Sequence, residues 1–356
     1  MEIIDICTLE TLLSAVQIRN KTLNLFTTIG SEDIQLCSIN LDDNELKVNE
    51  ELLITEVNDK RSRLLSDSNS RMVNALMRSA LLKPNLNKFR LQISQWDDVI
   101  FGLDTNIFYT CTITSSILDD LLKIPSGDFI DTPDWMTFVF SKVGMGEIEN
   151  RAGHSHNPTN RRQCLRAIQE IMMINRSKDL EGISLLLTGS IPPEIDYSTS
   201  TTNTVRDSTI REQFRSFLKT IDFHKGSYFL TQDFNSAVLA EAEGLKSLYI
   251  QKPNLPEQAI DFHTSDKVNV SEVLYELAVS FQPLILKMDG LELEFFSEWS
   301  GKNLNSWENW MMGIKWRKDD IKLNEEIQKL KKQEINQKIC AGWDNLKKRH
   351  VHWLEK

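Results

Sequence analysis

The stretch Val99-Ile-Phe-Gly-Leu-Asp104 constrains the fold most, because it is a short apolar run that ends abruptly in a carboxylate. A run with no polar face is typical of a central strand in a sheet that is covered on both sides. In parallel sheets, ligands bind beyond the carboxyl ends of the strands. Thr105 and Asn106 follow with side chains suited to turns and helix caps. We therefore expect Asp104 to lie where chemistry takes place.

Strand and helix signals alternate from about residue 97 to residue 265, which predicts an α/β domain with a central, mostly parallel sheet. Further strands are expected at 135–140, 183–188, 227–231 and 247–250. Helices are expected at 115–123, 161–174, 209–221 and 235–243. A polar, low-complexity loop at 198–204 interrupts this alternation.

Acidic residues follow several of these strands or begin the next helix. They are Asp104, Glu147 with Glu149, Asp207, and Asp233. Carboxylates gathered in one cleft repel one another, and they cannot all stay ionised unless a positive charge joins them. Because hard oxygen ligands favour Mg²⁺ or Mn²⁺, the sequence predicts a site for one of these cations. For any single aspartate, capping of a helix or turn is the more common explanation.

Four motifs in this order resemble the PIN-domain family of metal-dependent nucleases. They are the apolar strand before Asp104-Thr-Asn106, the segment Val143-Gly-Met-Gly-Glu147-Ile, the segment Asp207-Ser-Thr-Ile-Arg211, and Phe229-Leu-Thr231-Gln-Asp233 with the helix after it. Each motif alone is weak, and their order and context make the resemblance more specific. It covers about half of the chain, from Val99 to about Lys252. It implies a PIN-like three-layer α/β fold for this part.

The resemblance also implies a set of site residues and a reaction. Asp104, Glu147, Asp207 and Asp233 would be the catalytic, metal-binding quartet, and Asn106 and Thr231 would orient it. Glu149 competes with Glu147 for the second place, and Asn235 stands where some relatives carry another acid, so the number of metals stays open. The implied activity is hydrolysis of phosphodiester bonds in RNA, or in single-stranded or structured DNA, by metal-activated water.

Three arginines near the second motif are candidates for binding a nucleic-acid backbone. Arg151, Arg161 and Arg162 lie close to Glu149 in the sequence, and guanidinium groups bind phosphate in a bidentate manner. Surface arginines at the start of a helix are also common. The alternative to a nuclease is a catalytically inactive PIN-like scaffold that binds nucleic acid or a protein partner, and it is indicated by Asn235, by the competition between Glu147 and Glu149, and by the large segments on either side of the domain.

The two ends of the chain differ from the middle. Residues 1–95 combine strand-like alternation with one helical segment and predict a small accessory α+β domain, whereas 96–265 would be the nuclease domain. Residues 266–356 predict a helical extension, with helices at 271–286 and 321–346 and with six of the eight tryptophans. From Lys315 onward there are 12 Lys or Arg against 7 Asp or Glu. These aromatic and basic residues could bind a single strand of nucleic acid, or they could pack against the rest of the protein or against a second subunit.

Composition narrows the location and partners. No apolar run is long enough to span a bilayer, the N-terminus does not resemble a signal peptide, and the five cysteines are scattered, so we expect a cytoplasmic protein without a membrane partner. The net charge of −10 is not the basic footprint usual for nucleic-acid binding, which makes the basic C-terminal segment the local exception.

Overall fold

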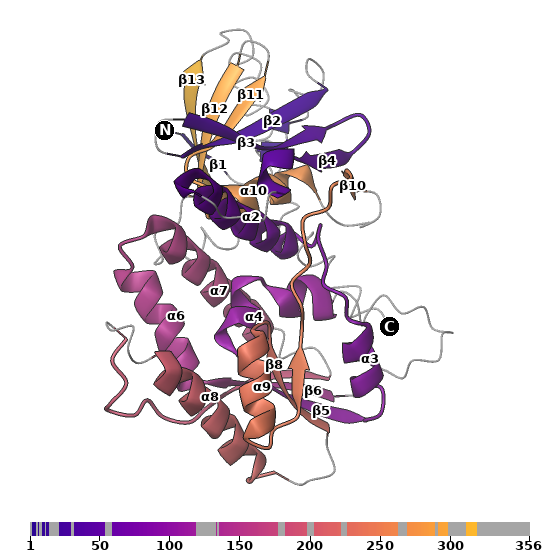
Figure 1. Cartoon of the computed structure of the whole chain (residues 1–356), viewed down its shortest axis with the longest axis vertical. Helices are drawn as coiled ribbons and strands as arrows, with labels where there is room; N and C mark the ends of the chain where they lie inside the picture. Colours follow the sequence, from indigo (N-terminus) through magenta and orange to yellow (C-terminus); the bar gives the residue numbers. More distant parts are fainter. Residues whose placement is uncertain are drawn as a thin grey trace, which may run out of the picture. The chain divides into compact units, whose positions relative to one another are not determined.

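The computed structural model divides the chain into two compact units (Figure 1). The first unit combines residues 1–82 with residues 254–356, and the second consists of residues 83–253. The structure describes residues 2–4, 6, 9–10, 12–13, 21–29, 32–53, 59–118, 133, 135–176, 182–197, 203–221, 226–262, 269–288, 291–297 and 311–318.

The first unit is built on an eight-stranded sheet in the order β1-β13-β12-β11-β2-β3-β4-β10. Every neighbouring pair is antiparallel. The strands are β1 (Glu2–Ile4), β2 (Thr22–Ile29), β3 (Glu32–Asn40), β4 (Glu45–Val48), β10 (Ile260–Asp261), β11 (Leu284–Met288), β12 (Leu291–Ser297) and β13 (Met312–Lys318). Strands from the two ends of the chain meet at β2 and β11, where Leu25 pairs with Leu286 and both side chains are fully buried.

Two long helices pack with this sheet in one hydrophobic core. They are α2 (Lys60–Arg78) and α10 (Val270–Ser280), and the short 3-10 helix η1 (Glu50–Leu53) precedes α2. Asp59 caps α2, because its side chain accepts a hydrogen bond from the backbone N–H of Ser62, whose hydroxyl is bonded in return to the backbone N–H of Asp59. This reciprocal capping box satisfies backbone donors that a helix start leaves unpaired.

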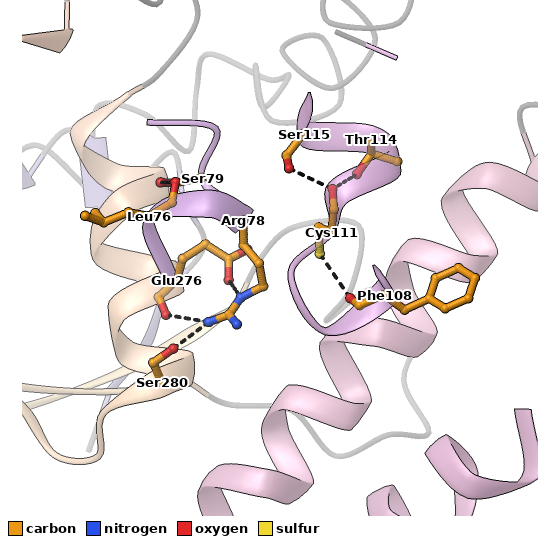
Figure 2. A network of polar contacts seen from close by, with 9 residues as sticks. All are labelled: Leu76, Arg78, Ser79, Phe108, Cys111, Thr114, Ser115, Glu276 and Ser280. Carbon is orange, nitrogen blue, oxygen red and sulfur yellow. Dashed lines mark hydrogen bonds and ion pairs between the residues drawn. The ribbon is translucent and has the colours of Figure 1, made fainter. Parts of the chain in front are cut away.

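A buried ion pair joins α2 to α10 within this unit. Figure 2 shows the guanidinium group of Arg78 pointing toward Glu276 and Ser280. Its Nε donates to Glu276 Oε2 at 2.6 Å, and its Nη2 donates to Ser280 Oγ at 2.5 Å and to the Glu276 carbonyl at 3.3 Å. Both charged side chains are 0% exposed. Each charge is therefore stabilised mainly by the other, because bulk solvent reaches neither side chain.

The second unit is built on a five-stranded sheet in the order β7-β6-β5-β8-β9, in which all neighbouring strands are parallel. The strands are β5 (Asp98–Leu103), β6 (Trp135–Ser141), β7 (Ile183–Thr188), β8 (Gly226–Thr231) and β9 (Ser247–Tyr249). The chain first adds strands on one side of β5 and then reverses to add β8 and β9 on the other side. The point of reversal lies between β5 and β8, and ligands of open parallel sheets bind at such points.

Helices lie on both faces of this parallel sheet. They are α3 (Asn87–Ile93), α4 (Thr105–Tyr109), the π-helical turn η2 (Ile113–Ile117), α6 (Lys142–His154), α7 (Pro158–Arg176), α8 (Asn203–Leu218) and α9 (Phe234–Ala242). On one face, Phe214 of α8 and Ala240 of α9 pack with Phe229. On the other face, Phe89 of α3 stacks on Phe101, with ring centroids 5.4 Å apart. The two sets of contacts make the unit a layered α/β structure.

The turn from α4 into η2 depends on Cys111, which has a left-handed backbone with φ of 50°. Figure 2 shows the side chains of Thr114 and Ser115 directed back to the carbonyl oxygen of Cys111. The Ser115 hydroxyl donates to that oxygen at 2.7 Å and the Thr114 hydroxyl at 3.4 Å. These bonds satisfy a buried carbonyl at a conformation that non-glycine residues rarely adopt.

The expected α/β character of the middle of the chain is confirmed, and the layout at the two ends differs from the expectation. The accessory domain 1–95 and the extension 266–356 were expected to be separate, but their described strands share one sheet. Residues 284–318 contain three strands where helix was expected, and the helix expected at 271–286 ends at Ser280. The expected helix at 321–346 and five of the six C-terminal tryptophans lie outside the described residues.

The reason for the difference is visible in β12, whose sequence Leu-Glu-Leu-Glu-Phe alternates with a period of two. Leu293 and Phe295 are fully buried, whereas Glu294 pairs with Lys315 and Arg317 of the neighbouring strand. Such alternation is the pattern of a strand with one face on a core. None of the described helices is both long enough and apolar enough to cross a membrane.

We predict that Arg78→Ala lowers the free energy of unfolding by about 3–5 kcal/mol, because it leaves the carboxylate of Glu276 buried without its partner. Urea denaturation followed by circular dichroism measures this loss. The matched control is Arg63→Ala on the exposed face of the same helix, which should change stability by no more than about 0.5 kcal/mol. The double variant Arg78→Met/Glu276→Leu should recover most of the loss. If the double variant is as unstable as Arg78→Ala, an unpaired charge is not the cause.

Candidate functional site

The reversal point of the parallel sheet brings Asp104 and Asp233 to neighbouring strand ends. Asp104 directly follows β5, and its backbone N–H donates to the Leu230 carbonyl of β8 at 3.0 Å. Asp233 lies two residues beyond the end of β8. Both carboxylates are therefore positioned by the hydrogen bonding of the sheet itself, from residues more than a hundred positions apart in the sequence.

Thr231 and Asn106 hold the carboxylate of Asp104 in one orientation. The Thr231 hydroxyl donates to Asp104 Oδ2 at 2.6 Å, and Asn106 Nδ2 donates to the same oxygen at 2.8 Å. Asn106 Nδ2 also lies 3.1 Å from the Thr231 hydroxyl oxygen, and Asn106 Oδ1 accepts from the Gln232 backbone N–H at 2.9 Å. The hydrogen bond from Gln232 fixes the orientation of the Asn106 amide, because only the amide oxygen can accept a hydrogen bond.

Asp233 caps helix α9. Its Oδ1 accepts from the backbone N–H groups of Asn235 at 2.8 Å and Ser236 at 3.4 Å. Its own N–H donates to the Thr231 hydroxyl oxygen at 3.0 Å. Because both capping bonds use Oδ1, the second carboxylate oxygen is available to another ligand. Asn235 contributes its backbone N–H to the cap, while its residue is exposed.

Helix α6 presents Glu147 and Glu149 in different surroundings. Glu147 is buried, with 6% of the residue exposed, and its Oε1 pairs with the guanidinium Nη2 of Arg151 one turn later at 2.8 Å. Glu149 is exposed. The charge of Glu147, and not that of Glu149, is among the causes that raise the pKa of Asp207. The structure therefore brings Glu147 toward the other carboxylates.

Two glycines allow α6 to approach its neighbours closely. A Cβ atom on Gly144 would lie 2.6 Å from the Phe140 ring, and one on Gly146 would lie 2.5 Å from the Tyr197 hydroxyl oxygen. That hydroxyl donates to the Val143 carbonyl at 3.0 Å. The glycines before Glu147 are thus needed for the packing that positions it.

The sequence predicted that Asp207 begins a helix. In the structure it is the fifth residue of α8 and lies inside the helix. Its pKa is raised to about 6, first by loss of water around the carboxyl group and then by the negative charges of Asp104 and Glu147. The positive charges of Arg211 and Arg206 act in the opposite direction. Although the residue is exposed on the helix surface, its carboxyl group is therefore close enough to the other acids to feel their charge.

Asp104 has a raised pKa for related reasons. Burial is the largest cause, hydrogen bonds from Thr231 and Ser236 oppose it, and the negative charge of Asp233 adds to it. The pKa of Asp207 responds to the charges of Asp104 and Glu147, and the pKa of Asp104 responds to the charge of Asp233, so these effects connect the four acids of the expected quartet in series. Repulsion of this kind is relieved when a cation binds between the carboxylates.

The carboxylates make the site negatively charged, but they do not form a complete coordination shell. Within the described part of the chain, no three His, Cys, Asp or Glu side chains converge closely enough to hold a metal ion as they stand. The donors that do gather are carboxylate oxygens, which suit Mg²⁺ or Mn²⁺. A bound cation would require side-chain movements, such as release of Glu147 from Arg151.

The three candidate arginines have different environments. Arg151 is partly exposed and ion-paired to Glu147. Arg161 is exposed near the start of α7, whereas Arg162 is largely buried and donates to the Thr159 hydroxyl oxygen at 3.3 Å. Arg151 and Arg161 can therefore reach a ligand from the surface more readily than Arg162 can.

Ser236 and Arg211 lie beside residues of the candidate site and were not predicted from the sequence. Ser236 is buried in the first turn of α9, and its side chain hydrogen bonds to Asp104. Arg211 is buried one turn after Asp207 and pairs with Glu243 at 2.8 and 3.0 Å. The position of Ser236 three residues after a capping aspartate was an available signal. The burial of Arg211 could not be inferred from its neighbours in the sequence.

We predict that, without metal, the stability advantage of the Asp207→Asn variant over wild type grows as the pH rises. The folded pKa of about 6 lies above the ordinary value of 3.8, so folding disfavours the ionised form. Wild type loses stability between about pH 4 and pH 7 as Asp207 ionises, and the amide does not. Thermal melts across this pH range in EDTA measure the difference. Asp97→Asn, at the amino end of β5, is the control; if both variants respond alike, Asp207 does not feel the other carboxylates.

No family model matches the sequence, and no curated protein matches it.

Proposed function

We propose that the second unit is a PIN-like, Mg²⁺- or Mn²⁺-dependent nuclease that hydrolyses phosphodiester bonds of RNA or DNA. The observation that carries this proposal is that Asp104 and Asp233 lie at neighbouring strand ends beside the reversal point of a parallel sheet, where Asp233 raises the pKa of Asp104 and where Asp104 and Glu147 raise the pKa of Asp207. The four motifs of the PIN resemblance supply all four of these residues. Chance caps at strand ends would have no reason to lie close enough together to raise the pKa of Asp104 and of Asp207.

The donor set suits a hard divalent cation. A bound Mg²⁺ or Mn²⁺ would supply an activated water and would stabilise negative charge on the phosphate during in-line attack. The protein's own residues do the positioning. Thr231 and Asn106 orient Asp104, and the α9 cap fixes Asp233 with one oxygen directed away from the helix N–H groups. Arg151 restrains Glu147 and is exposed enough to contact a phosphate.

The second candidate is a scaffold that binds nucleic acid or a protein partner without cutting it. The observation in its favour is that Glu147 is already neutralised by Arg151 at 2.8 Å, so one of the four carboxylates has a partner other than a metal. In that case the remaining acids would be too few or too far apart to bind a divalent cation. Metal binding and cleavage therefore separate the two candidates.

We predict that Asp104→Asn/Asp233→Asn abolishes cleavage of labelled single-stranded RNA or DNA by the purified full chain in Mn²⁺. The two amides keep the shape of the site and remove the charge that a cation needs. Asp97→Asn, the same substitution at the opposite end of β5, should leave cleavage unchanged. Equal cutting by wild type and the double variant would mean that the activity is a contaminant. No cutting by wild type on single-stranded or duplex RNA or DNA would favour the scaffold.

We predict that Thr231→Val weakens Mn²⁺ binding by about 10- to 100-fold, since groups that orient a metal ligand typically contribute that much. Valine keeps the shape and removes the hydroxyl that bonds to Asp104 at 2.6 Å. Isothermal titration calorimetry measures the affinity. Thr188→Val, at the end of β7 in the same sheet, is the matched control. An unchanged affinity in Thr231→Val would show that Asp104 needs no orientation by Thr231.

A further inference from the structure

A surface hollow of about 870 Å³ lies over the open edge of the parallel sheet in the second unit. It is lined by residues of α3, α9 and β9, and β9 is the last strand of the sheet. Its volume is within the range of small-ligand pockets, roughly 300–1,000 Å³. Nothing in the proposed catalytic chemistry uses this hollow.

Two exposed aromatic side chains line it. Phe234 is 63% exposed and Tyr249 is 41% exposed. Their ring centroids are 5.7 Å apart and the rings are nearly perpendicular, at 77°. Aromatic side chains usually bury most of their area, and exposed ones that share a concave surface are typical of binding sites.

Two residues that line the hollow adjoin residues of the acidic site in the chain and in the sheet. Phe234 follows Asp233 in the sequence and begins α9, the helix that Asp233 caps. Tyr249 pairs in register with Thr231, whose hydroxyl bonds to Asp104. Phe234 is therefore next to Asp233 in the chain and Tyr249 is one strand away from Thr231, which places both rings beside the strand ends that carry Asp104 and Asp233.

The polar lining suits a negatively charged strand with hydrogen-bonding bases. Lys88 and Lys246 are exposed, and Lys246 Nζ lies over the Trp96 ring at 5.5 Å and over the Tyr228 ring at 5.9 Å. The one acidic residue among those that line the hollow, Glu241, already accepts a hydrogen bond from the Ser247 hydroxyl at 2.8 Å. The lining also contains four amide side chains: Asn85, Asn87, Gln92 and Gln251.

We propose that this hollow binds unpaired nucleotides next to the scissile phosphate, with bases stacking on Phe234 and Tyr249 and phosphates near Lys88 and Lys246. The inference rests on the proposed nuclease function and specifies its substrate as a single strand. Bases inside a duplex are stacked on each other and cannot offer their faces to protein side chains, whereas an unpaired strand offers every base.

The test is binding of fluorescently labelled oligouridine and oligothymidine to the full chain in EDTA, measured by anisotropy. Phe234→Ala and Tyr249→Ala should each weaken binding between about 5-fold and about 150-fold, the loss that one stacked base accounts for. Phe234→Trp should keep the affinity, because it keeps a stacking face. Leu239→Ala is the matched control, since Leu239 is exposed on the same helix but does not line the hollow. Circular dichroism checks that the variants fold.

The outcomes separate this proposal from the proposed function. If the alanine variants lose single-strand affinity and wild type does not cut in Mn²⁺, the hollow binds nucleotides and the nuclease proposal fails. If wild type cuts and Phe234→Ala/Tyr249→Ala binds both oligonucleotides as wild type does, the nuclease proposal stands and the stacking site is overturned. An equal loss of affinity for duplex and single strand would also overturn it, as would a wild type that binds no oligonucleotide. That last result would favour a protein ligand for the hollow.

Discussion

The geometry of the site depends on the hydrogen bonds made by the hydroxyl group of Thr231. It donates to Asp104 Oδ2 at 2.6 Å and accepts from the backbone N–H of Asp233 at 3.0 Å. One side chain thus ties together the ends of β5 and β8 and the start of α9. A threonine suits this position because it combines a β-branched carbon, which fits the end of a strand, with a hydroxyl that both donates and accepts.

Buried charge is paired with an opposite charge in the first unit, whereas in the second unit it lies near like charges. In the first unit, the charge of Arg78 is compensated by Glu276 at 2.6 Å, and the pair joins two helices. In the second unit, Asp104 is buried among hydrogen-bond donors but also near other negative charges, and its pKa rises. Uncompensated charge of this kind opposes folding, and it is usually kept where a ligand provides the missing charge. The contrast accounts for Arg78 and Glu276 as core residues of their unit and supports the proposal that Asp104 belongs to a ligand site.

The second unit was predictable because its signals are local. Each strand is a short apolar run, and its end is marked by a polar residue such as Asp104 or Thr231, so that both the sheet and the meeting of its carboxyl ends follow from the sequence. The motif placed Glu147 in the quartet with Glu149 as its competitor, and the sequence could not settle this choice because it depends on which face of α6 packs inward. Phe234 was not predictable, because only its exposure in the folded unit reveals it as a surface ring.

The first unit could not be assembled from local signals, because its sheet joins segments more than 250 residues apart. Thr27 on β2 pairs with Leu284 on β11, and the hydroxyl of Thr27 donates to the Pro283 carbonyl at 3.1 Å. No property of residues 22–29 indicates that their partner follows the whole second unit in the sequence. Their apolar side chains need a neighbouring strand, but period-two alternation specifies a face and not a partner. The second unit is therefore an insertion between two halves of one sheet, so a boundary drawn by composition divides a core that the fold keeps whole.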